Sequence, residues 1–200
     1  MSSGQARDTA APEDQAPDPT ELSAVGPRTP HPAQFEQLYA LYFEFTWRVL
    51  RHLGVQTSSL DDAVQEVWLV VYQRLGGFEG RSTIKTWLFG IARNVARNTR
   101  RAEDKRVRQL LAPEPQSEPP DPEMEHLGRE AWLRVQHFLS TLDEERRAIF
   151  VCSLLEHLPA QQTAEATGMD VTTVYQRVRT LRQAFKQWLD AASAEPEMTP

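Results

Sequence analysis

A proline-rich, acidic stretch in the middle of the chain restricts its fold more than any other sequence feature. Within residues 111–125 the prolines are Pro113, Pro115, Pro119, Pro120 and Pro122. Proline lacks a backbone N–H and clashes with the preceding turn, so helices and central strands do not continue through such a segment. We therefore expect residues 111–125 to be a flexible acidic linker between two compact blocks, residues 33–110 and 126–189.

The two ends of the chain have the composition of disordered segments. Residues 1–32 contain six prolines and almost no large apolar residue. A segment of this kind cannot bury enough apolar surface to offset the entropy that it loses on ordering. We predict disordered tails over residues 1–32 and residues 190–200.

The sequence disfavours several classes of protein. No stretch reaches the roughly 18 uninterrupted apolar residues of a membrane helix, and the N-terminus lacks the apolar core of a secretory signal. Cys152 is the one cysteine, which excludes an intramolecular disulfide and a Cys-rich zinc site. We expect a cytoplasmic protein with no membrane insertion, no metal site and no cofactor.

The first block shows the spacing of amphipathic helices, with apolar residues three and four positions apart. The expected helices cover residues 35–53, 58–75 and 83–106. Ser58 stands three residues before Asp61, a spacing that predicts a capping box at the start of the second helix. No run alternates with a period of two for long enough to form a strand. The block is therefore predicted to be a three-helix bundle.

The second block also reads as helical. Two amphipathic helices are expected over residues 127–139 and 143–155, followed by a short helix over 160–166. Gly168 then turns the chain, and Asp170 caps a final helix that runs to residue 189. A short helix, a glycine-containing turn and a longer helix together form a helix-turn-helix. The predicted fold class is all-α, with two small helical domains and the helix-turn-helix in the second.

Charge is distributed unevenly along the chain. The formal net charge is −6 at pH 7, yet residues 81–110 carry nine basic side chains against two acids. Residues 170–188 carry a net charge of +3, and the segment 111–130 carries −5. Two separated basic segments indicate two surfaces that face a polyanion. Ordinary solvated helix faces explain the same charge pattern about as well.

An acidic segment at the start of the second helix is a candidate docking surface. Its polar residues are Asp61, Asp62, Gln65 and Glu66, with Trp68 as a candidate anchor at the edge. The helix dipole favours acids in a first turn, so a cap with a solvated face is the simplest explanation. A metal or acid–base pair is disfavoured, because no His or further carboxylate lies at ligand spacing within the segment.

The third helix combines basic and aromatic side chains. Arg93, Arg97, Arg100 and Arg101 share one stripe of the helix, with Phe89 one turn and Lys85 two turns earlier. Single-stranded nucleic acid requires cations for its phosphates and aromatic faces for its unstacked bases. Trp87 is better explained as a core residue, whereas Phe78 lies in a glycine-flanked loop and is the stronger candidate for a base contact.

The final helix has the residues of a recognition helix. Once Val174 and Val178 face the core, the outward residues of its first half are Thr172, Thr173, Tyr175, Gln176 and Arg179. That half of a recognition helix reaches base edges in the major groove, where Gln pairs with adenine and Arg with guanine. A polar face in solvent is the alternative.

Taken together and in this order, the three segments resemble the bacterial sigma factors of the extracytoplasmic-function subfamily, within the sigma-70 family. The acidic segment 61–68 resembles the helix that docks on the clamp of the largest RNA polymerase subunit. The stretches 78–80, 86–88 and 91–94 resemble the region that melts the promoter and captures a flipped base of the minus-ten element. The final helix resembles the region that reads the minus-thirty-five element as a duplex.

The resemblance implies a role for each domain and a set of site residues. Residues 33–110 would be sigma region 2, and residues 126–189 sigma region 4, a helix-turn-helix of the winged-helix-like superfamily. The implied minus-ten residues are Phe78, Lys85, Trp87, Arg93, Asn94, Arg97, Arg100 and Arg101. The implied minus-thirty-five residues are Thr172, Thr173, Tyr175, Gln176, Arg177 and Arg179. Thr163 departs from the pattern, because family members usually carry an aliphatic residue there.

The implied function is transcription initiation in a stress or envelope-signal response. The implied partners are core RNA polymerase, promoter DNA and an anti-sigma factor, and the chain would not be an enzyme. Two other functions remain open at this point. One is a DNA-binding regulator that uses the helix-turn-helix without polymerase, and the other is a nucleic-acid enzyme with Asp61, Asp62 and Glu66 as metal ligands.

Overall fold

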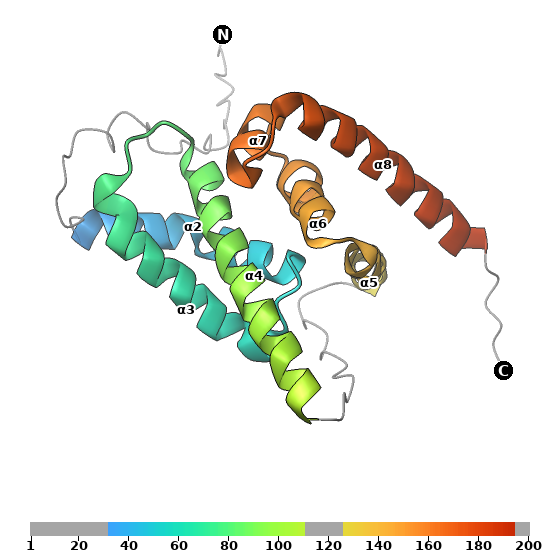
Figure 1. Cartoon of the computed structure of the whole chain (residues 1–200), viewed down its shortest axis with the longest axis horizontal. Coiled ribbons are helices and arrows are strands. Elements are labelled where there is room, and N and C mark those ends of the chain that lie inside the picture. The colour runs from blue at the N-terminus through green and yellow to red at the C-terminus, as the bar shows by residue number, and fades with distance from the viewer. Residues whose placement is uncertain (1–31, 111–125, 195–200) are drawn as a thin grey trace, which may run out of the picture.

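The computed structural model describes residues 32–110 and 126–194, and every regular element within these ranges is helical (Figure 1). The predicted all-α class is therefore confirmed. The predicted linker, residues 111–125, lies outside the described residues, as do residues 1–31 and 195–200 of the predicted tails. Within the described residues, no helix is long and apolar enough to cross a bilayer.

The first domain is a bundle of three long helices. They are α2 (Pro32–His52), α3 (Thr57–Arg74) and α4 (Ile84–Leu110), and a short 3₁₀ turn (Leu75–Gly77) follows α3. The core side chains come from the predicted apolar faces, since Val49, Val67 and Leu88 are fully buried. The chain turns between α2 and α3 at Gly54, whose φ of 87° belongs to the left-handed region that glycine tolerates.

The predicted capping box at Ser58 is wrong. Helix α3 begins at Thr57, and Gln56 precedes it without a side-chain cap. The backbone N–H of Gln56 instead donates to the carboxylate of Glu103, at 3.3 Å. Glu103 lies on α4 and is buried. Glu103, a residue distant in sequence, thus accepts the hydrogen bond from the N–H that precedes the helix. The local pair Ser58–Asp61 does not form the cap.

The second domain contains the expected helix-turn-helix. Its elements are α5 (His126–Thr141), α6 (Glu144–Phe150), a π-helical turn (Val151–Leu155), α7 (Ala160–Thr167) and α8 (Val171–Ala194). Gly168 ends α7 in the left-handed conformation, as predicted from the turn glycine. Two predicted bounds are corrected, because α8 continues to Ala194 and the helix predicted over 143–155 becomes π-helical after Phe150.

Thr163, the departure from the family pattern, lies at a fully buried position of α7. Its hydroxyl donates to the carbonyl of Leu158 at 3.3 Å. A buried hydroxyl costs little free energy when it is hydrogen-bonded, so the second domain accommodates the polar residue.

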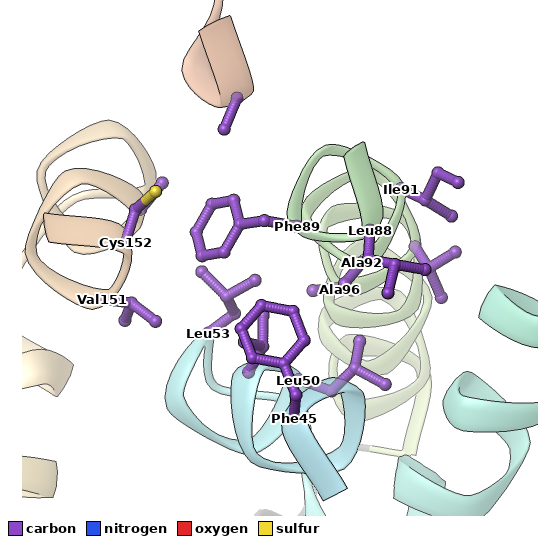
Figure 2. Close-up of a cluster of buried hydrophobic side chains, with 14 of the residues drawn as sticks. Phe45, Leu50, Leu53, Leu88, Phe89, Ile91, Ala92, Ala96, Val151 and Cys152 are labelled. Carbon is purple, nitrogen blue, oxygen red and sulfur yellow. The ribbon is translucent and has the colours of Figure 1, made fainter. Parts of the chain in front are cut away.

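The two domains are packed against each other through α4 and α7. Phe89 of α4 is fully buried, and Figure 2 shows its ring between Val151 and Cys152 of the second domain and Leu53 of the first. The buried apolar residues of the two domains form one continuous cluster. The sequence predicted two separate compact blocks, so this shared core is a finding of the structure.

Arg147 fixes the second domain to the end of α2. Its guanidinium is buried and donates to the carbonyls of Leu139 and Leu142, each at 2.9 Å, and to that of Leu53 at 3.4 Å. A Cβ at Gly54 would lie 2.8 Å from Nη1 of Arg147, so a larger residue there would displace the guanidinium. Burial lowers the pKa of Arg147 to about 10, which leaves the side chain cationic at neutral pH.

We predict that Arg147→Met lowers the free energy of unfolding by about 2–4 kcal/mol, because buried carbonyls lose a charged donor. Urea unfolding followed by circular dichroism measures the change. Arg146→Met is the matched control, since Arg146 is exposed and its ion pair among the described residues is with Asp143, at 3.4 Å. The control should change stability by about 0.5 kcal/mol or less. Equal effects of the two substitutions would contradict the role of Arg147.

Candidate functional site

The acidic segment lies on the exposed face of α3. Asp61, Asp62, Gln65 and Glu66 are all exposed, with the buried positions of the same helix turned toward α2 and α4. Among the described residues, no group of three or more His, Cys, Asp or Glu side chains could hold a metal ion. The face offers carboxylates and an amide to a partner without any rearrangement of the helix.

Trp68 does not lie at the edge of this face as an exposed anchor. The residue is 4% exposed and packs edge-on against Phe35, with a ring-centroid distance of 5.9 Å. Its ring also lies 4.8 Å from that of Tyr39, measured between centroids. Trp68 is therefore a core residue that joins α3 to the start of α2, and its role as an anchor at the edge of the acidic face stays a prediction.

An apolar hollow of about 530 Å³ adjoins the acidic face, and it was missed in the sequence. Asp61 and Gln65 line one side of it. The other lining residues are Phe35, Tyr39, Phe43, Val64, Trp68, Leu69 and Tyr72. Leu69 and Tyr72 are large side chains that remain exposed. Leu69 and Tyr72 lie four and seven residues after Gln65, which places them on the same side of α3 as the polar residues. Two large apolar side chains on a polar helix face are the sequence signal that could have predicted the hollow.

The loop before α4 brings two predicted base-contacting residues together. The rings of Phe78 and Trp87 lie 4.9 Å apart between centroids, and both side chains are half-buried. Their contact gives the loop a fixed aromatic surface. Thr83 and Thr86 are hydrogen-bonded to each other at 2.8 Å where α4 begins.

The basic stripe of α4 is only partly open to solvent. Lys85, Asn94 and Arg101 are exposed, whereas Arg93, Arg97 and Arg100 are half-buried. Arg93 donates from Nη1 to the carbonyl of Thr167 at the end of α7, at 2.9 Å. Phe89, predicted beside this stripe, is fully buried under the second domain. The stripe therefore lies along the boundary between the domains.

The first half of α8 presents most of its predicted residues to solvent. Thr172, Gln176 and Arg179 are exposed, as is Tyr175 at 65%, while Thr173 is half-buried. Arg177 is half-buried and forms an ion pair with Glu145 of α6, Nη1 to Oε1 at 2.8 Å. The outward residues are therefore Thr172, Tyr175, Gln176 and Arg179.

Asp170 caps the start of α8 as predicted. Its carboxylate accepts from the backbone N–H of Thr172 at 2.8 Å and of Thr173 at 3.4 Å. The hydrogen bonds from Thr172 hold the pKa of this carboxyl below its usual value. The cap fixes the direction in which the first turn of α8 leaves the turn at Gly168.

The candidate surfaces lie on different sides of the molecule. Figure 1 shows α4 in the middle, with α3 on one side and α7 and α8 on the other. The structure thus brings the α4 stripe next to the helix-turn-helix and keeps the acidic face of α3 apart from both. A protein partner on α3 would not compete directly with nucleic acid on α8.

Two family models match the chain, one on each domain. Residues 38–106 match the model described as Sigma-70 region 2, and residues 132–184 match the one described as Sigma-70, region 4. Both lie in the described ranges and in the order predicted from the sequence.

Curated relatives match most of the chain. RNA polymerase sigma factor CnrH of Cupriavidus metallidurans is 27% identical over 170 residues, which cover 80% of this chain and 88% of that protein. ECF RNA polymerase sigma factor SigX of Bacillus subtilis is 28% identical over 161 residues, covering 74% and 82%.

Two solved structures share the fold. CnrH in complex with the cytosolic domain of CnrY matches with a TM-score of 0.63 and 21% identity, over 86% of this chain and 95% of that one. The sigma factor RpoE in complex with the anti-sigma factor NepR, from Bartonella quintana, matches with a TM-score of 0.65 and 19% identity, over 78% and 97%.

Proposed function

The chain belongs to the extracytoplasmic-function sigma factors of the sigma-70 family, and we propose that it binds core RNA polymerase and directs it to promoters. The observation that carries the proposal is the order of three surfaces: an acidic face on α3, a basic and aromatic surface at α4, and an exposed recognition helix. Each surface suits one step of initiation. In this account the chain is a DNA-binding initiation factor without a covalent step of its own, and it acts in the cytoplasm with polymerase.

The acidic face of α3 is the proposed contact with the clamp of the largest polymerase subunit. Asp61, Asp62, Gln65 and Glu66 are exposed and rest on a well-packed helix. Charge complementarity at such a face directs association and excludes wrong partners. The neighbouring hollow, lined by Leu69 and Tyr72, offers apolar surface for the same contact.

The surface of α4 and its preceding loop is the proposed site for the melted minus-ten strand. Lys85, Arg97 and Arg101 offer cations for phosphates, and the paired rings of Phe78 and Trp87 offer a surface for an extruded base. Asn94 and Arg100 extend the same surface, and Arg93 would join it once its bond to Thr167 is released. Extruding a base costs a few kcal/mol of unstacking free energy, which these contacts would offset.

The first half of α8 is the proposed reader of the minus-thirty-five duplex. Gln176 and Arg179 are exposed and have the side chains that pair with adenine and guanine in the major groove. Thr172, Thr173, Tyr175 and Arg177 are proposed to position the helix, with Arg177 held by Glu145.

The signal that calls for this activity is proposed to arise from stress or from the cell envelope. An anti-sigma factor is proposed as a further partner.

Core polymerase mixed with this chain should produce promoter-dependent transcripts, and Asp62→Arg with Glu66→Arg should abolish them. The reversal places like charges at the polymerase contact, which costs several kcal/mol of binding free energy. Co-purification with core polymerase and transcript yield are the measurements. The control carries the same charge change at two exposed acids of the second domain, Glu165→Arg and Asp190→Arg, and should still bind core polymerase.

The following results would contradict the proposed function or the docking site on α3. A regulator that acts alone would bind duplex DNA and give no transcripts with core polymerase. Metal-dependent DNA cleavage would support the enzyme instead. If the α3 reversal leaves both co-purification and folding unchanged, the acidic face is not the docking site.

Gln176→Ala and Arg179→Ala should each cost about 1–3 kcal/mol at the preferred upstream element and relax discrimination at one base pair. The measurement is transcription of a promoter library by polymerase carrying each variant. Arg182→Ala is the matched control, because Arg182 is exposed one turn further along α8 and outside the proposed reading half. A uniform loss across all upstream sequences for Gln176→Ala and Arg179→Ala would make them backbone contacts.

A further inference from the structure

The apolar hollow beside the acidic face has the size and composition of a small-molecule site. Its volume of about 530 Å³ lies within the range of ligand pockets in proteins, about 300–1,000 Å³. Seven of its nine lining residues are aromatic or aliphatic, and the other two are Asp61 and Gln65. Ligand sites combine apolar walls with a few polar groups that orient the ligand, and this hollow has both.

The aromatic walls come from two helices. Helix α2 supplies Phe35, Tyr39 and Phe43, and α3 supplies Trp68 and Tyr72, with neighbours on each helix four residues apart. The ring of Tyr39 lies 4.8 Å from that of Trp68, and the ring of Phe35 lies 5.2 Å from that of Tyr72 at an interplanar angle of 90°. Each row of rings therefore packs against the other helix and is held in place without a ligand.

The hollow is open to solvent on one side. Val64 and Trp68 are buried and belong to the packed part of its lining, whereas Tyr39, Leu69 and Tyr72 are exposed. Single exposed apolar side chains are ordinary on a protein surface, but a group of them around one hollow is typical of a binding site. A molecule in solution can therefore reach the aromatic walls without unfolding either helix.

The charge around the hollow favours a cation. Asp61 lines it, and no Lys, Arg or His does so among the described residues. Exposed acids stand next to the lining residues on both helices, namely Glu36 on α2 and Asp62 and Glu66 on α3. The faces of aromatic rings carry the negative part of the ring quadrupole and also attract cations. Carboxylates and rings thus select the same sign of charge, and an anionic ligand would be repelled.

The hydrogen-bonding capacity of the lining restricts the kind of cation. A primary ammonium has three N–H donors and a guanidinium has five, and each donor needs an acceptor once it leaves water. The acceptors of the hollow are concentrated at Asp61 and Gln65, on one side, and most of the remaining wall is rings and alkyl groups. A quaternary ammonium has no N–H donor and presents methyl groups to aromatic faces, so it fits such a wall better.

We propose that the hollow binds a small quaternary ammonium compound of the choline type. The methylated ammonium would lie against the exposed rings of Tyr39 and Tyr72, with Asp61 as the counter-charge. The ligand is a free small molecule, because the volume of the hollow suits one and both helices already hold the walls in place. This site goes beyond the proposed role in transcription and does not depend on it.

Titration of the full chain with choline chloride tests the site. The measurement is the NMR signal of the Trp68 indole N–H, which is identified by its loss in Trp68→Phe, while the signals of the four other tryptophans report that this variant is folded. Choline should shift the Trp68 signal to saturation with a Kd of about 1–10 mM, in the range that so small a ligand allows. Sodium chloride at the same ionic strength should not shift it.

The neutral isostere of choline, in which a quaternary carbon replaces the nitrogen, has the same shape without the charge. It should bind about tenfold more weakly or less, because it gains neither the cation–π attraction nor the attraction to Asp61. Tyr72→Leu should weaken choline binding about three- to tenfold, since it removes an exposed ring and keeps apolar bulk. Tyr72→Phe is the matched control, and it should bind choline like the unsubstituted chain.

The counter-charge has its own matched pair of variants. Asp61→Asn should weaken choline binding about three- to tenfold, because it removes the carboxylate that lines the hollow. Asp62→Asn removes the same charge from an exposed neighbour outside the lining, and its effect should stay within about twofold.

Several results would overturn the inference. One is the lack of a saturable shift of the Trp68 signal up to about ten times the expected Kd. Another is equal affinity for choline and its neutral isostere, which would leave only an apolar surface. Equal effects of Tyr72→Leu and Tyr72→Phe, or of Asp61→Asn and Asp62→Asn, would also count against it. All these measurements use the chain without polymerase, so their failure leaves the proposed function untouched.

Discussion

The burial of Phe89 is the interaction on which the arrangement of this molecule depends. The ring leaves α4 on the side that faces the second domain and fills the space between Val151, Cys152 and Leu53 (Figure 2). Exposing an aromatic side chain of this size to water costs about 1.5–3 kcal/mol, so the closed packing is favourable even before its polar contacts are added. Because Phe89 and Arg93 are one helical turn apart, the same turn of α4 carries the interdomain core and a DNA-binding candidate. Domain packing and the exposure of Arg93 are therefore physically linked.

Much of the fold could be predicted from the sequence because it is encoded locally. The three- and four-residue spacing of apolar side chains predicted the long helices, and Gly168 with Asp170 predicted the turn and cap of the helix-turn-helix. The failures have a common cause, which is a partner from a distant part of the chain. Glu103 replaces the predicted cap before α3, and Arg147 finds its acceptors at Leu139, Leu142 and Leu53. No local pattern specifies such partners.

The candidate site was predictable where helical phase alone decides exposure. Gln176 and Arg179 are exposed because Val174 and Val178 face the core. Helical phase did not predict exposure where another part of the chain covers the outward face of the helix. Phe89 was predicted beside the basic stripe, and it is covered because the second domain supplies a partner that the helix alone does not reveal. Trp68 is buried because the start of α2 packs over it.

Cross-linking the two domains tests most directly the central claim that they pack together around Phe89. Thr83 and Gln162 face each other across the boundary, with 3.3 Å between Oγ1 and Oε1, so cysteines at both positions can be joined by a short reducible cross-linker. The account predicts that the chain with both cysteines forms the internal cross-link in high yield and that Phe89→Ala lowers this yield, because the ring fills the space between the domains. No internal cross-link, or an equal yield in the Phe89→Ala variant, would contradict it.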